Sequence, residues 1–387
     1  MADGQFSSSP PCTPSTPEED ALARLRLIRS RRVGPVTFWR LLADHGSAAA
    51  ALAALPEVAQ AAGVEDYAPC PIELARAEVA AARRAGARMV LRGMPHYPAA
   101  LADLPDAPPL LWVIGDTALL TRPMVALVGA RNASSLGIRM ARRMAGELKE
   151  AGFVVVSGLA RGIDAAAHEA ALPGATVAVQ AGGVDVIYPV ENADLARRIA
   201  EAGCRVSEQP MGLEPQARHF PVRNRLISGL AQAVVVVEAA ARSGSLITAR
   251  TALDQGREVY AVPGHPFDAR AGGCNMLIRD GATLVRSAAD VIEAIAPAPT
   301  PQPVAPALPP PVVADEAKPK RPLSRPLREI AALHSAILAR LGPSPMAEDQ
   351  LIRDLALSAA EVAPQLLTLE LEGKVLRQPG GLLSKLN

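Results

Sequence analysis

Four segments of this 387-residue sequence combine small residues with Arg or Asn in a pattern that suits phosphate binding. They are residues 128–137, 157–164, 219–229 and 243–248. Small residues let backbone N–H groups approach an anion, and the N-terminus of a following helix adds positive potential. Each segment therefore indicates a loop that can hold a phosphate group, although an ordinary capped helix or an internal salt bridge would use the same residue types.

The third segment is also a basic patch in a chain whose formal net charge is only +1. No acidic residue occurs between Glu214 and Glu238, whereas Arg218, Arg223 and Arg225 do. A guanidinium group can hold a phosphate through two parallel hydrogen bonds. We therefore expect Arg223 and Arg225, at the start of a helix, to clamp phosphates unless they form internal salt bridges.

The same segments lack the signatures of nucleotide cofactors and of catalysis. Arg131 stands where a dinucleotide fingerprint needs its second Gly, no carboxylate follows the apolar run that ends at Ser157, and no Walker motif occurs. The four Cys and six His are scattered, so they indicate neither a disulfide framework nor a zinc site. Asp164 and His168 are four residues apart, which predicts a structural hydrogen bond on one helix face more than a catalytic pair. We predict no cofactor, no metal and no catalytic residue.

One enzymatic alternative stays open on the sequence. A nucleotide phosphoribohydrolase has a related Rossmann-like fold and also places Gly and Ser loops on a phosphate. Such an enzyme needs a carboxylate near the glycosidic centre, and the nearest candidates are Asp164, Glu169 and Glu238. The release of free base from a nucleoside monophosphate would distinguish this enzyme from a binding protein.

Apolar runs alternate with helical patterns between residues 124 and 296. The expected strands are Val125–Val128, Val154–Ser157, Thr176–Gln180, Val206–Ser207, Val234–Glu238, Val259–Val262 and Thr283–Val285. Val-rich strands that alternate with helices predict a mainly parallel sheet covered on both faces, which is the Rossmann-like, doubly wound α/β class. Ligands of this class bind at the carboxyl ends of the strands, so the four segments should meet there and form one elongated anion site.

Composition and periodicity divide the whole chain into six parts. We predict a disordered tail (1–19), a small helical domain (20–85), a connector with one short strand (86–123), the Rossmann-like domain (124–296), an extended Pro-rich linker (297–326) and a winged-helix domain of three helices and a hairpin (327–387). The third of these last helices, Ser358–Gly373, carries Glu361, Glu370 and Glu372. These acids disfavour a transcriptional regulator that would read a DNA groove with this helix.

The global composition narrows the possibilities further. Aromatic residues make up only 3% of the chain, which disfavours a module that stacks many bases on aromatic rings. The N-terminus lacks the apolar core of an export signal, and no apolar run is long enough to span a bilayer. We therefore expect a cytoplasmic protein without a membrane partner.

Ordered motifs through the central domain resemble the DNA-processing protein A family, also called Smf. They include Gly129-Ala130-Arg131, Ser157–Asp164, Gly183–Pro189, Arg223-Asn224-Arg225, Ser243–Ala249 and Val262-Pro263-Gly264. The N-terminal helices resemble the family's sterile-alpha-motif-like domain, and the C-terminal unit resembles its winged helix. Cys274 and Gln180 are mild departures from the family pattern.

The resemblance implies a binding protein without catalytic activity. Members of the family bind and protect single-stranded DNA on the Rossmann-like domain, form homodimers, and help to load the RecA recombinase onto incoming strands in natural transformation. Carried over position by position, the DNA-binding residues are Gly129, Arg131, Ser157, Gly158, Arg161, Gly162, Arg223, Asn224, Arg225, Ser243, Gly244 and Ser245. Binding through the phosphate backbone of the DNA should then show weak sequence preference, and its affinity should depend steeply on salt.

Overall fold

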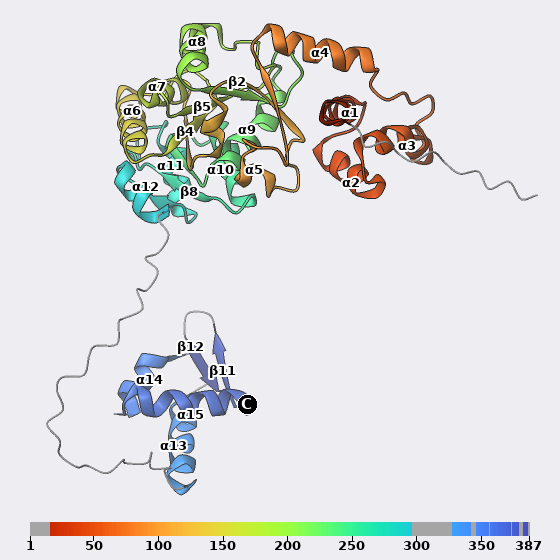
Figure 1. Cartoon of the computed structure of the whole chain (residues 1–387). Coiled ribbons are helices and arrows are strands. Elements are labelled where there is room, and N and C mark those ends of the chain that lie inside the picture. Colours follow the sequence, from red (N-terminus) through yellow and green to blue (C-terminus); the bar gives the residue numbers. More distant parts are fainter. Residues whose placement is uncertain are drawn as a thin grey trace, which may run out of the picture. The chain divides into compact units, whose positions relative to one another are not determined.

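The computed structural model describes residues 16–295, 327–341, 346–355, 357–372, 374–378 and 382–385 (Figure 1). The chain divides into two compact units, Met1–Thr300 and Pro301–Asn387. Most of the predicted tail and all of the predicted Pro-rich linker lie outside the described residues.

A nine-stranded sheet of order β1-β2-β6-β5-β4-β3-β7-β8-β9 forms the centre of the first unit. Its strands are β1 (Arg88–Leu91), β2 (Leu110–Gly115), β3 (Met124–Gly129), β4 (Val154–Ser157), β5 (Thr176–Val179), β6 (Cys204–Ser207), β7 (Ala233–Glu238), β8 (Glu258–Ala261) and β9 (Thr283–Leu284). β2 is antiparallel to its two neighbours, β1 and β6. All other neighbouring strands in this order are parallel. The predicted Rossmann-like, doubly wound class is thus confirmed, and all seven expected strands are present.

Helices cover both faces of this sheet because its strands are apolar on both sides. In β3, Ala126 and Val128 face one layer, whereas Val125 and Leu127 face the other, as alternation along a strand requires. The first layer contains α5 (Ala99–Ala102), α9 (His219–Leu230), α10 (Ser245–Asp254) and α11 (Gly272–Arg279). The second contains α6 (Ser135–Glu150), α7 (Ile163–Ala171), α8 (Ala193–Ala202) and α12 (Ala288–Ile295). Short 3₁₀ helices occur at η1 (Thr117–Thr121) and η2 (Val190–Asn192).

The chain order makes β3 the switch point of the sheet. From β3 the chain proceeds outward through β4, β5 and β6, and it then returns to β7 on the opposite side of β3 before it continues to β8 and β9. Ligands of doubly wound sheets bind in the crevice outside the carboxyl ends of the strands at such a point. The topology therefore directs attention to the loops after β3, β4 and β7.

Four helices precede the sheet: α1 (Pro17–Arg29), α2 (Pro35–His45), α3 (Ala48–Ala61) and α4 (Ile72–Arg84). Thr16 and Glu19 form a capping box at the start of α1, so residues 17–19, which we expected in the tail, belong to this helix. Phe38, Leu41 and Leu52 are buried in a core that these helices share. The predicted helical domain is confirmed.

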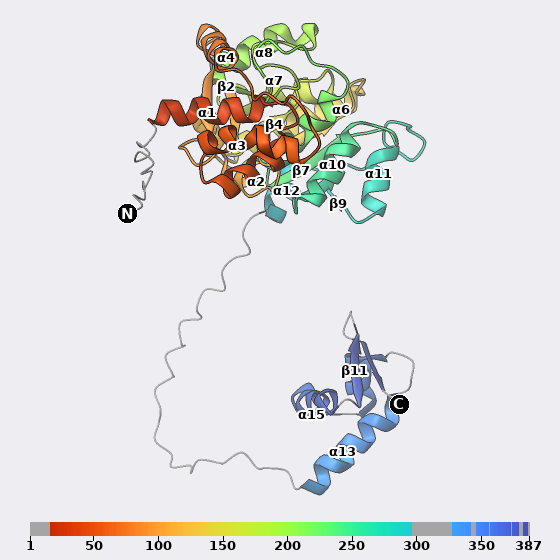
Figure 2. The ribbon, with the colours of Figure 1, turned by 90° about the vertical axis from the view of Figure 1, so that its right-hand side faces the viewer.

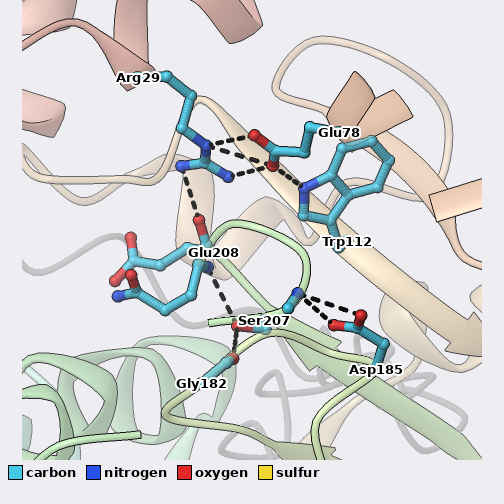
Figure 3. Close-up of polar contacts among 9 residues, drawn as sticks. Arg29, Glu78, Trp112, Gly182, Asp185, Ser207 and Glu208 are labelled. Atoms are coloured by element: carbon cyan, nitrogen blue, oxygen red, sulfur yellow. Dashed lines mark hydrogen bonds and ion pairs between the residues drawn. The ribbon is translucent and has the colours of Figure 1, made fainter. Parts of the chain in front are cut away.

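A polar network connects these helices to the sheet (Figure 3). The Arg29 guanidinium group donates to the Glu78 carboxylate at 2.8 Å and to the backbone carbonyl of Glu208 at 3.2 Å. Trp112 of β2 donates its indole N–H to the same carboxylate at 2.7 Å. Residues 86–123, predicted as a connector, therefore do more than join two domains, because β1 and β2 extend the sheet and carry the surface on which the helices pack.

The second unit is a winged helix. It contains α13 (Leu327–Arg340), α14 (Glu348–Leu355) and α15 (Ala359–Leu371), with a three-stranded sheet of order β10-β12-β11. The strands are β10 (Met346–Ala347), β11 (Val375–Gln378) and β12 (Leu382–Lys385). A capping box of Ser358 and Glu361 starts α15, and Ile337, Leu351 and Leu366 lie in a common core. Figure 2 shows the three helices and the sheet from a second direction.

The structure adds one observation on membranes. Among the described residues, no helix combines the length and the apolarity that crossing a bilayer requires.

Candidate nucleic-acid interface

The carboxyl ends of β3, β4 and β7 surround a cleft of about 790 Å³. All four segments singled out in the sequence contribute to its lining. The lining residues are 128–132 of the first segment, Ala160 and Asp164 of the second, Phe220, Pro221, Arg223, Asn224 and Ile227 of the third, and Ser243–Ser245, Ile247 and Thr248 of the fourth. The predicted convergence at the switch point is therefore observed. The individual side chains differ greatly, however, in how far they reach the solvent of the cleft.

One part of the lining, which we call the outer rim, consists of Arg131, Arg242 and Ser243–Ser245. Arg131 and Arg242 are exposed, and in the described part of the chain neither forms an ion pair. The hydroxyl groups of Ser243 and Ser245 lie 2.7 Å apart at the start of α10. Ser245 is buried, at 9% exposure, and Ser243 is half-buried. The outer rim therefore presents mainly its two guanidinium groups to a ligand.

An aromatic pair lies beside the outer rim. The rings of Tyr188 and Phe220 are 5.6 Å apart, and the Arg131 guanidinium carbon lies 5.4 Å from the centre of the Phe220 ring. Both rings also line an adjoining pocket of about 230 Å³, together with Arg161. Stacking on aromatic rings is one of the ways in which unpaired bases are held, so this pair extends the chemistry of the cleft beyond phosphate contacts.

A second set of residues at the cleft, which we call the inner wall, consists of Ser157–Asp164 and Arg223, of which Ala160, Asp164 and Arg223 line the cleft itself. The backbone N–H groups of Gly158 and Ala160 donate to the Asp164 carboxylate at 3.1 and 3.4 Å. Ser157 is fully buried and donates its hydroxyl to the carbonyl of Leu127 at 2.6 Å. We expected these groups to hold a phosphate, but the chain already satisfies them, so Ser157 does not present its side chain to a ligand.

Arg223 is a buried group of the inner wall. It is only 5% exposed and donates to the carbonyl of Val179 at 2.7 Å. A Cβ atom on Gly158 would overlap its guanidinium group, so that glycine makes room for Arg223. Burial lowers the pKa of Arg223 to about 10, against the opposing effect of the Asp164 carboxylate. Arg223 lines the cleft, but it is not the exposed phosphate clamp that we expected.

Arg225 belongs to a different environment, although it is only two residues away. Its guanidinium group forms ion pairs with Asp106, at 3.5 Å, and with Glu208, and it donates to the carbonyl of Asp106 at 2.8 Å. The side chain is 12% exposed, and the residue is absent from the lining of the cleft. The internal salt bridge, which was the alternative for this residue, is what the structure shows.

The glycines of the first two segments serve packing. A Cβ atom on Gly129 would lie 2.6 Å from the side chain of Ile163, and one on Gly162, whose φ is +77°, would overlap the carbonyl oxygen of Ala130. Arg161, within the second segment, is exposed, and its guanidinium group lies 3.6 Å from the Glu191 carboxylate. Asn224 and Gly244 line the cleft as expected.

The carboxylates required by the enzymatic alternative do not converge. Glu169 pairs with Arg142 at 2.9 Å on the outside of α6 and α7, and Glu238 accepts hydrogen bonds from Ser134. Asp164 is 7% exposed, and burial raises its pKa while Arg223 lowers it. The expected bond between Asp164 and His168 is replaced by one from His168 to Thr176, at 2.6 Å. Among the described residues, no group of three His, Cys, Asp or Glu could hold a metal ion.

Sequence reasoning gave no binding role to four charged or aromatic residues of the cleft: Arg242, Arg270, Tyr188 and Phe220. Arg242 directly precedes the fourth segment, and its position next to Ser243 was the available signal. Tyr188 lies within a motif quoted for the resemblance and Phe220 within the third segment, but the low aromatic content of the chain argued against a role in base stacking. Arg270 pairs with Asp268 at 3.1 Å, and only the folded loop after β8 brings it to the cleft.

The fold and the cleft together define a multidomain protein with a Rossmann-like binding domain. The family model described as DNA recombination-mediator protein A matches residues 88–296, and models described as the DprA-like N-terminal HHH domain and the DprA winged helix domain match residues 18–81 and 318–381. The chain belongs to the DNA recombination-mediator protein A family. Its N-terminal helices match an HHH domain, in place of the sterile-alpha-motif-like domain that the resemblance implied.

Individual relatives agree with this assignment. Protein Smf of Synechocystis is 36% identical over 306 residues, which cover 74% of this chain and 77% of that protein. The structure of DNA processing protein A from Streptococcus pneumoniae is similar, with a TM-score of 0.56 and 33% identity, over 67% of this chain and 98% of that one. A structure from Helicobacter pylori, reported for the single-stranded DNA binding mode of DNA processing protein A, has a TM-score of 0.50 and 30% identity, over 54% and 96% of the chains.

Proposed function

We propose that this protein binds single-stranded DNA in the cleft at the carboxyl ends of β3, β4 and β7. It holds the strand mainly by its phosphates, without catalysis, and passes it to the RecA recombinase during DNA uptake. It works in the cytoplasm as a homodimer. The likeness to the Helicobacter pylori protein, whose structure was reported for its single-stranded DNA binding mode, supports the choice of ligand.

The observation that carries the proposal is the outer rim. Arg131 and Arg242 are exposed on the same cleft, and neither is neutralised by an ion pair in the described part of the chain. Free guanidinium groups favour a polyanion, because each releases condensed counterions when it contacts a phosphate. The net charge of the whole chain is only +1, so the attraction for nucleic acid is local to this surface.

The aromatic pair favours an unpaired strand over a duplex. Tyr188 is 50% exposed and its ring lies beside that of Phe220. A base can stack on such a ring only when it is not enclosed in a double helix. One stacked base between phosphate contacts tolerates any sequence, since every base has a flat face. The proposed preference is therefore for single strands with little sequence selectivity.

The test is a salt titration of oligonucleotide affinity for the wild-type chain and for the double variant Arg131→Ala with Arg242→Ala. Charge-assisted contacts contribute roughly 1.5–3 kcal/mol each, so we expect single-strand affinity to fall by at least about tenfold. The slope of log K against log salt should also decrease by about 1.4, because each lost contact with a single strand accounts for about 0.7.

A matched control is the double variant Arg143→Ala with Arg197→Ala, which removes two exposed charges from the outer helices α6 and α8. It should bind single strands with nearly the wild-type salt slope. Equal losses in both double variants would show that the binding is a general charge effect, and unchanged binding of the Arg131 and Arg242 variant would refute the proposed site.

A further inference from the structure

Glu238, the last residue of β7, directs its carboxylate at the N-terminus of α6. The backbone N–H of Ser134 donates to Oε1 at 2.9 Å, and the Ser134 hydroxyl donates to Oε2 at 2.5 Å. The same hydroxyl accepts a hydrogen bond from the backbone N–H of Gly137 at 2.9 Å. Glu238 is only 8% exposed, so this carboxylate forms part of the interior between β3, β7 and α6.

Gly137 provides the space for this carboxylate. A Cβ atom at this position would overlap Oε2 of Glu238. Glycine within a helix is less stable than alanine, and here the absent side chain admits a charged group against the first turn. The backbone of Glu238 is held as well, because Ala130 donates its N–H to the Glu238 carbonyl at 2.7 Å.

This position has a defined use in doubly wound sheets. The strand at the switch point leads through a Gly-rich turn into a helix, and the phosphates of a bound nucleotide lie at the N-terminus of that helix. In this chain the corresponding elements are β3 and α6. A nucleotide phosphate does not fit there, because the negatively charged Glu238 carboxylate already accepts the hydrogen bond of the Ser134 N–H group. The same carboxylate also fills the space beside Gly137.

We propose that Glu238 is a specificity-determining residue that acts as a built-in substitute for a nucleotide phosphate. Its carboxylate satisfies the anion position of α6 from within the chain, and so excludes mononucleotides and dinucleotides from the cofactor position of the fold. The remaining anion-binding groups then lie on the outer rim, where a polymer can reach them. The proposal rests on the contacts of Glu238 and does not depend on the proposed binding of single-stranded DNA.

The experiment is an anion rescue of the variant Glu238→Ala, with inorganic phosphate as the probe. Thermal unfolding of the full chain is followed in increasing phosphate and in chloride at matched ionic strength. Removal of the carboxylate should lower Tm and leave a cavity lined by the Ser134 N–H. Phosphate should then raise the Tm of this variant in a saturable way, by roughly 3–6 °C at about ten times its Kd.

Two control variants separate this role from a merely structural one. Glu238→Gln keeps the volume of the side chain without its charge and should show no saturable phosphate response. Glu169→Ala removes an exposed carboxylate from α7 and should respond to phosphate as the wild-type chain does. Adenosine 5′-phosphate should likewise stabilise Glu238→Ala but not the wild-type chain.

The proposal is overturned if Glu238→Ala responds to phosphate no more than Glu238→Gln and the wild-type chain do. If the alanine variant does not fold in chloride, it is refolded in phosphate. Recovery of the cooperative transition supports the proposal, and failure to recover counts against it. Since no DNA is present in these measurements, a failure here is distinct from a failure of the proposed function.

Discussion

The inner wall and the outer rim use similar residue types for different purposes. On the inner wall, the N–H groups of Gly158 and Ala160 bind the Asp164 carboxylate, and Arg223 is buried behind Gly158. On the outer rim, Arg131 and Arg242 remain exposed beside hydroxyl groups. The inner wall is thus internally neutralised, whereas the outer rim retains its capacity for an external anion.

This difference depends on where the chain places its own carboxylates. Asp164 follows Gly158 by six residues and turns back to the N–H groups of that loop. Glu238 precedes the outer rim, but its side chain extends to α6 and leaves residues 242–245 unaffected. A Gly- and Ser-rich turn at a strand end can therefore bind a phosphate only if no carboxylate of the chain already occupies its N–H groups.

The largest effect that would test this comparison is the destabilisation caused by Arg223→Ala. Loss of the guanidinium group leaves Asp164 buried without its cationic neighbour and the Val179 carbonyl without its donor. Arg223 forms no ion pair with Asp164 among the described residues, and leaving a buried carboxylate without a nearby cation costs up to about 3–5 kcal/mol, the scale of buried ion pairs. Arg131→Ala should change the free energy of unfolding by no more than about 0.5 kcal/mol, as is usual for exposed positions. Denaturant unfolding of both variants measures the contrast.

A second variant identifies the cause of this destabilisation. In Arg223→Ala combined with Asp164→Asn the uncompensated carboxylate is also removed, so part of the lost stability should return. If Arg223→Ala is as stable as Arg131→Ala, the inner wall is not the internally paired structure described above.

A smaller effect concerns the pH dependence of stability behind the inner wall. Burial, with a lesser contribution from Arg223, lowers the pKa of His168 from 6.5 to about 3. The unfolded chain then binds more protons than the folded one in this range. The contribution of His168 is therefore fully present above about pH 6.5 and is lost as the pH falls toward 3, by up to about 1.4 kcal/mol per pH unit. Unfolding free energies at several pH values between 7 and 4 measure this slope.

The control for this slope is His168→Gln, which retains a polar partner for Thr176 but does not titrate. The variant should lose most of the acid dependence. Asp164 contributes with the opposite sign, because its raised pKa gives stability that is present at low pH and is lost as the pH rises. A wild-type slope in His168→Gln would show that His168 is not the titrating group.

Much of the fold could be predicted because apolar patterning is local. Strands such as β3, β4 and β7 are Val-rich runs that are buried on both faces, and this pattern located them in the sequence. β1 was not foreseen, because a four-residue strand that begins at Arg88 has little periodicity. Its pairing with β2 depends on residues 19 to 25 positions away.

The site was predictable at the level of loops but not of side chains. Strand ends meet by topology, so the cleft followed from the fold class. Whether a given Arg is exposed depends on tertiary partners, which the sequence does not reveal: Arg225 reaches Asp106 and Glu208, and Arg223 turns inward over Gly158. Arg131 has no such acid within the described residues, so the same residue type remains available there.

The smallest expected effect comes from Arg161, which lies on the boundary between the two regions. It belongs to the loop of the inner wall, yet it is exposed and lines the smaller pocket beside Tyr188 and Phe220. Its ion pair with Glu191 is 3.6 Å long, and the two side chains are 56% and 62% exposed. Exposed pairs of this kind are weak, so Arg161 stays partly available to a strand.

We therefore expect Arg161→Ala to reduce single-strand affinity by only roughly twofold to threefold at moderate salt, well below the effect of the outer-rim variant. Glu191→Ala should have the opposite effect and tighten binding slightly, because it releases Arg161 from its partner. Fluorescence anisotropy with a labelled oligonucleotide resolves both changes. A tenfold loss in Arg161→Ala would move the boundary of the binding surface into the β4 loop, and the division between a neutralised inner wall and an available outer rim would then no longer hold.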